Sequence, residues 1–220
     1  MTDFPFRTVV FDLDGTLADT APDLTGALNH ALGVLGRRPV PHEDVRHMVG
    51  NGARALLQKG LAATGDVSDA LVEQGFPIFL AYYEDHIADH SRPWPGVEAA
   101  LDALAAKGVA LSICTNKLEG LTHRFIATMG WQGRFASVVG GDTLPVRKPD
   151  PAPLFEAIAR AGGGRAAFVG DSITDTDTAK NAGLPCVAVT FGFSDRPPED
   201  LGATVLIDHF DALVGALAGL

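Results

Sequence analysis

Two acidic residues, Asp12 and Asp14, follow the apolar run VVF near the start of the chain. Residues i and i+2 of a strand point to the same side, so these two carboxylates are expected to lie close together. At a separation of ~4 Å and an effective dielectric constant of ~20, two such charges repel each other by ~4 kcal/mol. The pair therefore has two interpretations. Either a cation or a proton holds the carboxylates together, or the strand has ended and both are solvated.

Polar side chains also follow three later apolar runs. Thr115 and Asn116 follow VALSIC, Lys148 comes after ASVVG and a loop, and Asp171 and Asp175 follow AAFVG. Carboxylate oxygens suit a hard divalent cation such as Mg²⁺, and the hydroxyl, amide and ammonium groups then remain to bind an anion. The combined set predicts Mg²⁺ and a phosphate group at one site.

A calcium-binding loop is the other chemistry that an acidic run starting at Asp12 suggests. Such a loop has glycine at its sixth position and glutamate at its twelfth. These positions hold Leu17 and Asp23 here, so the register does not fit. A single Asp-x-Asp-Gly turn is usually only a turn. A site is predicted by all four polar clusters together, because each of them follows an apolar run.

Strand-like apolar runs alternate with helical patterns through most of the chain. The expected strands cover residues 7–14, 109–115, 136–140, 166–170, 186–190 and 203–207. Such alternation is typical of a parallel sheet covered on both faces, so the expected fold is α/β, a Rossmann-like parallel sheet flanked by helices. Ligands of these sheets bind at the carboxyl ends of the strands, where the polar clusters are expected to meet.

The alternation stops between residues 18 and 91, where only helical patterns are convincing. Helices are expected around the leucines at 24, 28, 32 and 35, over residues 45–57, and over residues 71–87. The segment ends in SRPWPGV, whose two prolines and one glycine suit a semi-rigid hinge. We therefore expect a core formed by residues 1–17 and 92–220 and an inserted all-helical domain formed by residues 18–91.

Composition limits the possible partners. The 220 residues carry a formal net charge of −10 without a basic run, so nucleic acid is not an expected partner. No run of 18 apolar residues occurs, and the first residues lack the basic start and long apolar stretch of a signal peptide. With both cysteines in apolar runs, we expect a cytoplasmic protein with no membrane partner.

Taken together, the four motifs resemble those of the haloacid-dehalogenase-like hydrolases. They are DLDGT at 12–16, TN at 115–116, KP at 148–149 and GDSITD at 170–175. The helical insert resembles the C1-type cap of that superfamily. The stretches VGNGARALLQKGL, YYEDH and PWPGV are similar to its phosphoglycolate phosphatase branch.

The resemblance implies a Mg²⁺-dependent phosphatase that works through an aspartyl-phosphate intermediate. Asp12 would be the nucleophile, and Asp14 would act as general acid and then as general base. Mg²⁺ would be held by the carboxylates of Asp12 and Asp171 and by the backbone carbonyl of Asp14.

The remaining motif residues would bind the phosphoryl group. Thr115 and Lys148 would contact its oxygens, with Gly15 and Asn116 beside them. Asp175 would orient either Lys148 or a metal-bound water.

The expected substrate is a small anionic metabolite, 2-phosphoglycolate, which would be hydrolysed to glycolate and phosphate. Another small phosphomonoester or pyrophosphate is an alternative, and a non-catalytic phosphate-binding protein is an alternative of a different class. Within the cap, GNGAR at 50–54 combines two glycines with Arg54, which is expected to bind the substrate carboxylate. The alternative is that these glycines begin a helix and Arg54 faces solvent.

Overall fold

The core contains a six-stranded sheet with the strand order β5-β4-β1-β6-β7-β8, in which every neighbouring pair is parallel. The computed structural model describes residues 4–194 and 196–220. Each strand lies within one of the ranges expected from the sequence, so the α/β fold is confirmed. The strands are β1 Thr8–Phe11, β4 Ala110–Cys114, β5 Ser137–Val139, β6 Ala166–Gly170, β7 Cys186–Val189 and β8 Val205–Ile207.

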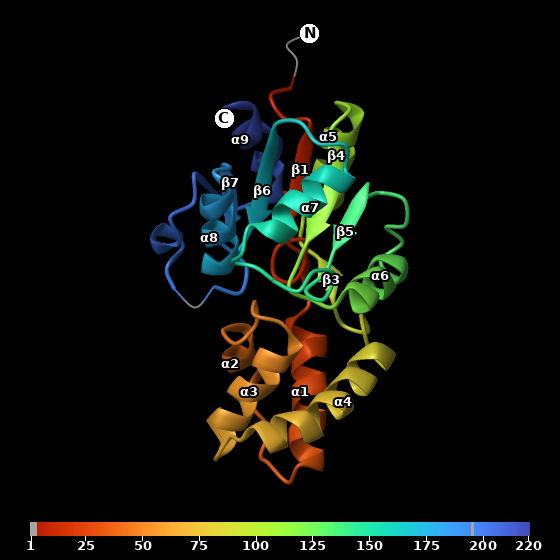
Figure 1. Ribbon diagram of the computed structural model, residues 1–220, viewed down its shortest axis with the longest axis vertical. Coiled ribbons are helices and arrows are strands. Elements are labelled where there is room, and N and C mark those ends of the chain that lie inside the picture. Colours follow the sequence, from red (N-terminus) through yellow and green to blue (C-terminus); the bar gives the residue numbers. More distant parts are fainter. Residues whose placement is uncertain (1–3, 195) are drawn as a thin grey trace.

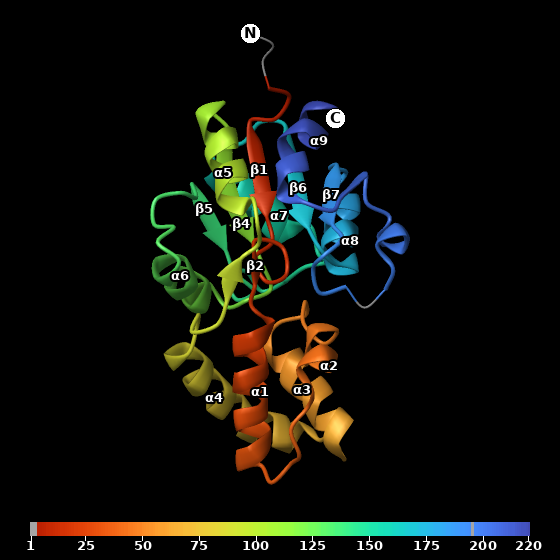
Figure 2. The same cartoon turned by 180° about the vertical axis from the view of Figure 1, so that it is seen from behind.

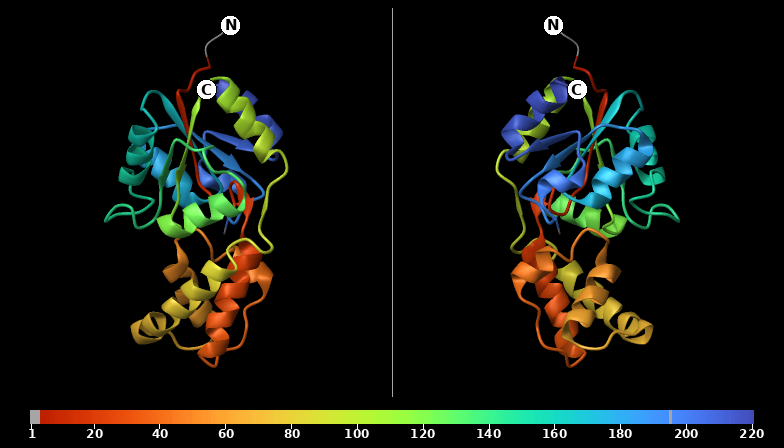
Figure 3. Two further views of the ribbon diagram at one scale, coloured as in Figure 1. Left: turned by 90° about the vertical axis from the view of Figure 1, so that its right-hand side faces the viewer. Right: turned by 90° about the vertical axis from the view of Figure 1, so that its left-hand side faces the viewer.

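Helices cover both faces of the sheet, as the apolar strands predict (Figures 1 and 2). One face is covered by α7 (Ala152–Arg160) and α8 (Ile173–Ala182), and the other by α5 (Val97–Ala106) and α9 (Leu213–Ala218), as the side views show (Figure 3). Every residue of β1, β6 and β7 is buried. The remaining helices of the core are α6 (Glu119–Thr128) and two 3₁₀ helices, Pro198–Leu201 and Phe210–Ala212.

The register of the central strand determines which residues meet at the carboxyl edge. Phe11, the last residue of β1, pairs with Ile113 of β4 and with Val169 of β6. The chain segments that follow these strands, beginning with Asp12, Thr115 and Asp171, therefore leave the sheet at one edge.

Four helices lie beyond that edge and form a separate group (Figure 1). They are α1 (Ala21–Val34), α2 (His42–Arg46), α3 (Ala53–Thr64) and α4 (Asp69–Asp85), and α1 packs against the other three. Two short antiparallel strands, β2 (Ala18–Asp19) and β3 (Arg92–Pro93), connect the group to the core. No described helix combines the length and apolar character that a membrane crossing requires.

Buried Asp23 ties the start of the helical group to its end. Its Oδ2 accepts hydrogen bonds from Ser91 N (2.7 Å) and Ser91 Oγ (2.6 Å), and both of its oxygens accept from His90 N (3.1 Å). Because Asp23 lies on α1 and Ser91 comes directly before β3, these bonds fix the two connecting segments against each other.

Two expectations for the insert were wrong. The predicted helix over residues 45–57 is interrupted, because α2 ends at Arg46 and α3 begins only at Ala53. Gly50 (φ 113°) and Gly52 (φ 85°) lie in the break and adopt a conformation that glycine tolerates far better than other residues. The short strand β2 also lies where no strand was expected, at the first residues of the insert.

Candidate active site

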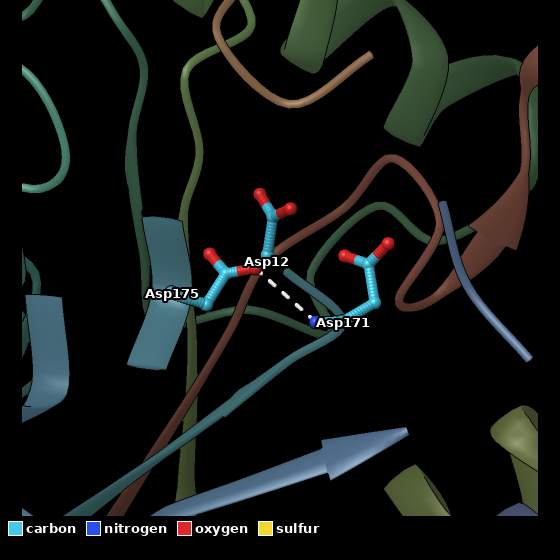
Figure 4. Close-up of side chains that lie close together, drawn as sticks. All are labelled: Asp12, Asp171 and Asp175. Atoms are coloured by element: carbon cyan, nitrogen blue, oxygen red, sulfur yellow. Dashed lines mark hydrogen bonds between the residues drawn. The ribbon is translucent and has the colours of Figure 1, made fainter. Parts of the chain in front are cut away.

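Three buried aspartates form a cluster at the carboxyl edge of the sheet (Figure 4). Asp12 follows β1, Asp171 follows β6, and Asp175 lies in the first turn of α8. One carboxylate oxygen of each lies within 4.8 Å of the other two. Asp171 is held in place by Thr16 Oγ1, which donates to its Oδ1 (2.9 Å), and by Phe193 N, which donates to its Oδ2 (2.6 Å).

Lys148 lies between two of these carboxylates. Its Nζ is 2.9 Å from Asp12 Oδ1 and 2.6 Å from Asp175 Oδ1. Asp175 is itself fixed by the start of α8, because its Oδ2 accepts from Ser172 N (3.1 Å) and Ser172 Oγ (2.7 Å). Asp175 is therefore in direct contact with Lys148, and which of its two expected roles it has stays a prediction.

Burial by itself would lower the pKa of Lys148, but the adjacent carboxylates of Asp12 and Asp175 outweigh it and raise this pKa above its usual value. Lys148 is therefore a permanent ammonium group. It offers the site a fixed positive charge at the carboxyl end of β1.

The carboxylate cluster carries more negative charge than Lys148 offsets. Burial, reinforced by the charges of Asp175 and Asp14, raises the pKa of Asp12 to about 6 despite the opposing effect of Lys148. Burial and the charges of Asp175 and Asp12 likewise raise the pKa of Asp171. A further positive charge beside these oxygens would stabilise both carboxylates in their ionised form.

The charge balance points to the same place. Asp12 Oδ1 is buried, and its polar contact among the residues that the structure describes is the ion pair with Lys148 Nζ at 2.9 Å, which Asp175 shares. Three close, buried carboxylates that share one ammonium group fit a hard divalent cation such as Mg²⁺. The side chain of Asp14 does not join this cluster.

Asp14 instead pairs with a lysine that the sequence analysis missed. Lys117 Nζ lies 3.0 Å from Asp14 Oδ1 and donates a hydrogen bond to Tyr83 Oη (2.5 Å). Burial and the charges of Asp14 and Asp23 raise the pKa of Tyr83, so its hydroxyl group stays neutral. The only sequence signal for Lys117 was its place directly after the TN motif. Each of the two acids of the first motif therefore pairs with an ammonium group of its own.

Asn116 connects the core to the break between α2 and α3. Its Nδ2 donates to Gly50 O (3.0 Å) and to Lys148 O (3.2 Å), and its buried Oδ1 has no hydrogen-bond partner in the described part of the chain. The neighbouring Thr115 is also buried, and its Oγ1 accepts from Lys117 N (3.3 Å).

A pocket lies between the core and the helical group, and the space among its lining atoms, open solvent included, is about 460 Å³. Its core side carries four of the motif residues, Asp12, Asp14, Thr115 and Asn116, together with Lys117, Leu118 and Leu121. Its other side carries Tyr83 and otherwise only apolar residues and glycines: Leu24, Val49, Gly50, Gly52, Ala53 and Leu56. The pocket is thus polar where the motifs lie and apolar where the helical group covers it.

Arg54 is the one predicted site residue that the structure does not bring to this region. Its guanidinium pairs with Glu73, lies 4.3 Å from the centre of the Phe76 ring and is 43% exposed. Gly52 is the N-cap of α3, which agrees with the alternative that the glycines begin a helix. A contact between Arg54 and a substrate remains a prediction without support from this geometry.

Gly15 shapes the turn that directly follows the two motif acids. It has a φ of 87°, and a Cβ atom at this position would lie 2.3 Å from Asp171 Oδ2. Its carbonyl accepts a hydrogen bond from Trp94 Nε1 (3.0 Å), so the turn is also fixed against the segment that follows β3.

Replacing Gly15 by alanine is expected to reduce kcat by more than tenfold, because the new methyl group must displace Asp171. The matched control is Gly108→Ala, since Gly108 has a φ of 76° but open space around its Cβ position. Both variants carry backbone strain of ~1–2 kcal/mol, measurable as a lower melting temperature. Only Gly15→Ala should lose activity, and equal kcat values in the two variants would contradict this role of Gly15.

The class of protein is defined by the parallel sheet and by the motif residues at its carboxyl edge. In chain order these residues are Asp12, Thr115, Lys148 and Asp171. Residues 9–189 match the model of the haloacid dehalogenase-like hydrolases, so the chain belongs to this family.

Among curated proteins, the chain is 45% identical to the phosphoglycolate phosphatase of Caulobacter vibrioides over 92% of its own length and 87% of that protein. It is 40% identical to the phosphoglycolate phosphatase of Agrobacterium fabrum over 99% of its length and 95% of that protein. Among solved structures, a predicted phosphoglycolate phosphatase from Haemophilus somnus superimposes with a TM-score of 0.90 at 29% identity, covering 96% of this chain and 98% of the other.

Proposed function

We propose that the protein is a Mg²⁺-dependent phosphatase that hydrolyses 2-phosphoglycolate to glycolate and phosphate. The observation that carries the proposal is the placement of two acids, Asp12 and Asp14, in one pocket, each beside its own buried lysine. The choice of substrate is supported by the curated relatives, which are 40–45% identical over nearly the whole chain.

Two acids with different roles can accomplish the reaction in two steps. In the first step, the Asp12 carboxylate attacks phosphorus and forms an aspartyl-phosphate while the bond to the ester oxygen breaks. Asp14 donates a proton to that leaving oxygen, which departs as the hydroxyl group of glycolate. In the second step, Asp14 takes a proton from a water molecule that attacks the aspartyl-phosphate, which releases phosphate and regenerates Asp12.

The surrounding residues bind and orient the phosphoryl group. Lys148 and the hydroxyl of Thr115 are proposed to contact its oxygens, and Asp175 keeps Lys148 in position. Phosphoryl transfer depends mainly on such positioning and charge stabilisation.

The proposed ligands of Mg²⁺ are the carboxylates of Asp12 and Asp171 and the backbone carbonyl of Asp14. When bound, the ion offsets negative charge on the phosphoryl oxygens and on the aspartates. Asp12 would then stay ionised, although burial raises the pKa of this carboxyl group.

The helical residues 18–91 are proposed to act as a cap that excludes bulk water from the pocket during the reaction. The hydrogen bond from Asn116 to Gly50 O supports this, because it joins the helical group to the core beside the pocket. The partner is then a small anionic metabolite that fits between cap and core. We place the enzyme in the cytoplasm, where the free thiols of Cys114 and Cys186 would stay reduced.

Activity is expected to disappear after treatment with a chelator and to return when Mg²⁺ is added. The measurement is release of inorganic phosphate from 2-phosphoglycolate by the purified protein before and after exhaustive chelation. Undiminished release after chelation would contradict the metal requirement. Binding of phosphate without any turnover in Mg²⁺ would favour a non-catalytic phosphate-binding protein instead.

A further inference from the structure

Lys117 is the only cationic side chain in the pocket lining among the residues that the structure describes. We propose that Lys117 binds the carboxylate of the substrate and so selects a phosphate ester that carries a carboxylate next to the ester carbon. This inference rests on the proposed function and names the residue that recognises the leaving group.

The charge of the substrate requires such a residue. A phosphorylated carboxylic acid brings two anionic groups into the pocket, and burying a carboxylate without a partner is unfavourable. Lys148 lies at the phosphoryl end, where it contacts Asp12 and Asp175. The carboxylate end therefore needs a second positive charge, and Lys117 supplies it.

Lys117 also lies at the right place relative to the reacting atoms. Its Nζ is 3.0 Å and 3.3 Å from the two carboxylate oxygens of Asp14. Asp14 must contact the ester oxygen to protonate it, and a single CH₂ group separates that oxygen from the carboxylate carbon in 2-phosphoglycolate. A donor that already contacts Asp14 is thus within reach of the substrate carboxylate.

The hydrogen bonds of Lys117 show which donor a ligand can take. A lysine ammonium has three N–H donors and no acceptor. In the described residues Lys117 Nζ donates to Tyr83 Oη and to both carboxylate oxygens of Asp14, and the contact with Asp14 Oδ2 is the longest of the three at 3.3 Å. A carboxylate bound in the pocket, which Lys117 lines, would replace this longest contact and leave the bonds to Asp14 Oδ1 and Tyr83 in place.

The cap helps to hold Lys117 in position. Tyr83 lies on α4, accepts a hydrogen bond from Nζ and places its ring 4.4 Å from that atom. The side chain of Lys117 is only 3% exposed, so its charge is shielded from bulk water. An ion pair with a bound carboxylate is stronger in such a place than at the surface.

The test compares two substrates of nearly the same size, 2-phosphoglycolate and 2-hydroxyethyl phosphate, which has a hydroxymethyl group in place of the carboxylate. For Lys117→Met, the ratio of the two kcat/KM values is expected to fall at least about tenfold from the wild-type ratio. Lys117→Gln keeps a donor for Asp14 but lacks the charge, and the same fall is expected. Lys107→Met, at an exposed lysine before β4, should keep the wild-type ratio.

Binding provides a readout that does not depend on turnover. Calorimetric titrations use Asp12→Asn and the double variant Asp12→Asn/Lys117→Met, each with both esters. We expect the second substitution to weaken binding of 2-phosphoglycolate at least about tenfold and binding of 2-hydroxyethyl phosphate far less. A purely structural role for Lys117 would weaken both equally.

The outcomes separate the inference from the proposed function. If Lys117→Met and Lys117→Gln reduce kcat/KM equally for both esters, Lys117 acts only on Asp14 and the inference is wrong, while the proposed function stands. The inference is also wrong if Arg54→Ala, rather than a Lys117 substitution, removes the preference. If the wild-type protein does not prefer 2-phosphoglycolate to 2-hydroxyethyl phosphate, the proposed substrate and the inference both fail.

Discussion

Replacing Asp12 by asparagine is expected to abolish turnover of 2-phosphoglycolate and to leave the fold intact. An amide is a poor nucleophile and a weak ligand for Mg²⁺, so the loss of kcat should reach several orders of magnitude. The substitution also removes one of three buried carboxylates that repel one another, and Lys148 keeps Asp175 as a partner. The melting temperature measured without Mg²⁺ should therefore not fall.

The measurements for this variant are phosphate release in a sensitive end-point assay and thermal unfolding by circular dichroism. A purified, folded Asp12→Asn protein that keeps a tenth of the wild-type kcat would show that another group is the nucleophile.

Replacing Asp14 by asparagine should be nearly as damaging, for a different reason. General acid–base catalysis typically contributes ~10²–10⁴-fold, and the loss should appear in full on 2-phosphoglycolate, whose alkoxide needs a proton to leave. The loss should be smaller on p-nitrophenyl phosphate, because nitrophenolate leaves without protonation. The measurement is kcat for both esters in the wild-type protein and the variant.

Asp102→Asn is the matched control for this experiment. Asp102 lies on α5 and pairs with Arg134, and its side chain is 68% exposed, so both rates should stay at the wild-type level. Equal losses on the two esters for Asp14→Asn would remove Asp14 from the role of proton donor to the leaving group.

The sheet and the motif cluster could be predicted because both depend on local patterns. Buried parallel strands such as β1 and β6 are short and apolar on both faces, which makes their sequences easy to recognise. Once the strands are parallel, their carboxyl ends lie at one edge, and the positions of Asp12, Thr115 and Asp171 follow from the order of the motifs.

The helical group was harder to predict because its residues are fixed by contacts between distant segments. A continuous helix was expected over residues 45–57, but Gly50 and Gly52 interrupt it, and Asn116 of the core donates a hydrogen bond to the break. Tertiary contacts of this kind override the periodicity of the sequence.

The same reason explains what the sequence did not reveal at the site. Lys117 was missed because its partners, Asp14 and Tyr83, lie 103 and 34 residues away in the sequence. Arg54 was expected to bind the substrate from its place after two glycines, and that contact stays a prediction. In the structure Arg54 pairs with Glu73 and lies over the ring of Phe76, and both residues belong to α4.

The central claim, hydrolysis of 2-phosphoglycolate, is tested most directly by kcat/KM values for a panel of phosphorylated metabolites in saturating Mg²⁺. The panel contains 2-phosphoglycolate, other small phosphomonoesters with and without a carboxylate, and pyrophosphate. We predict that 2-phosphoglycolate has the highest value by at least about tenfold, the factor expected of a charge-assisted contact to its carboxylate. A higher value for pyrophosphate or for an ester without a carboxylate would contradict the account.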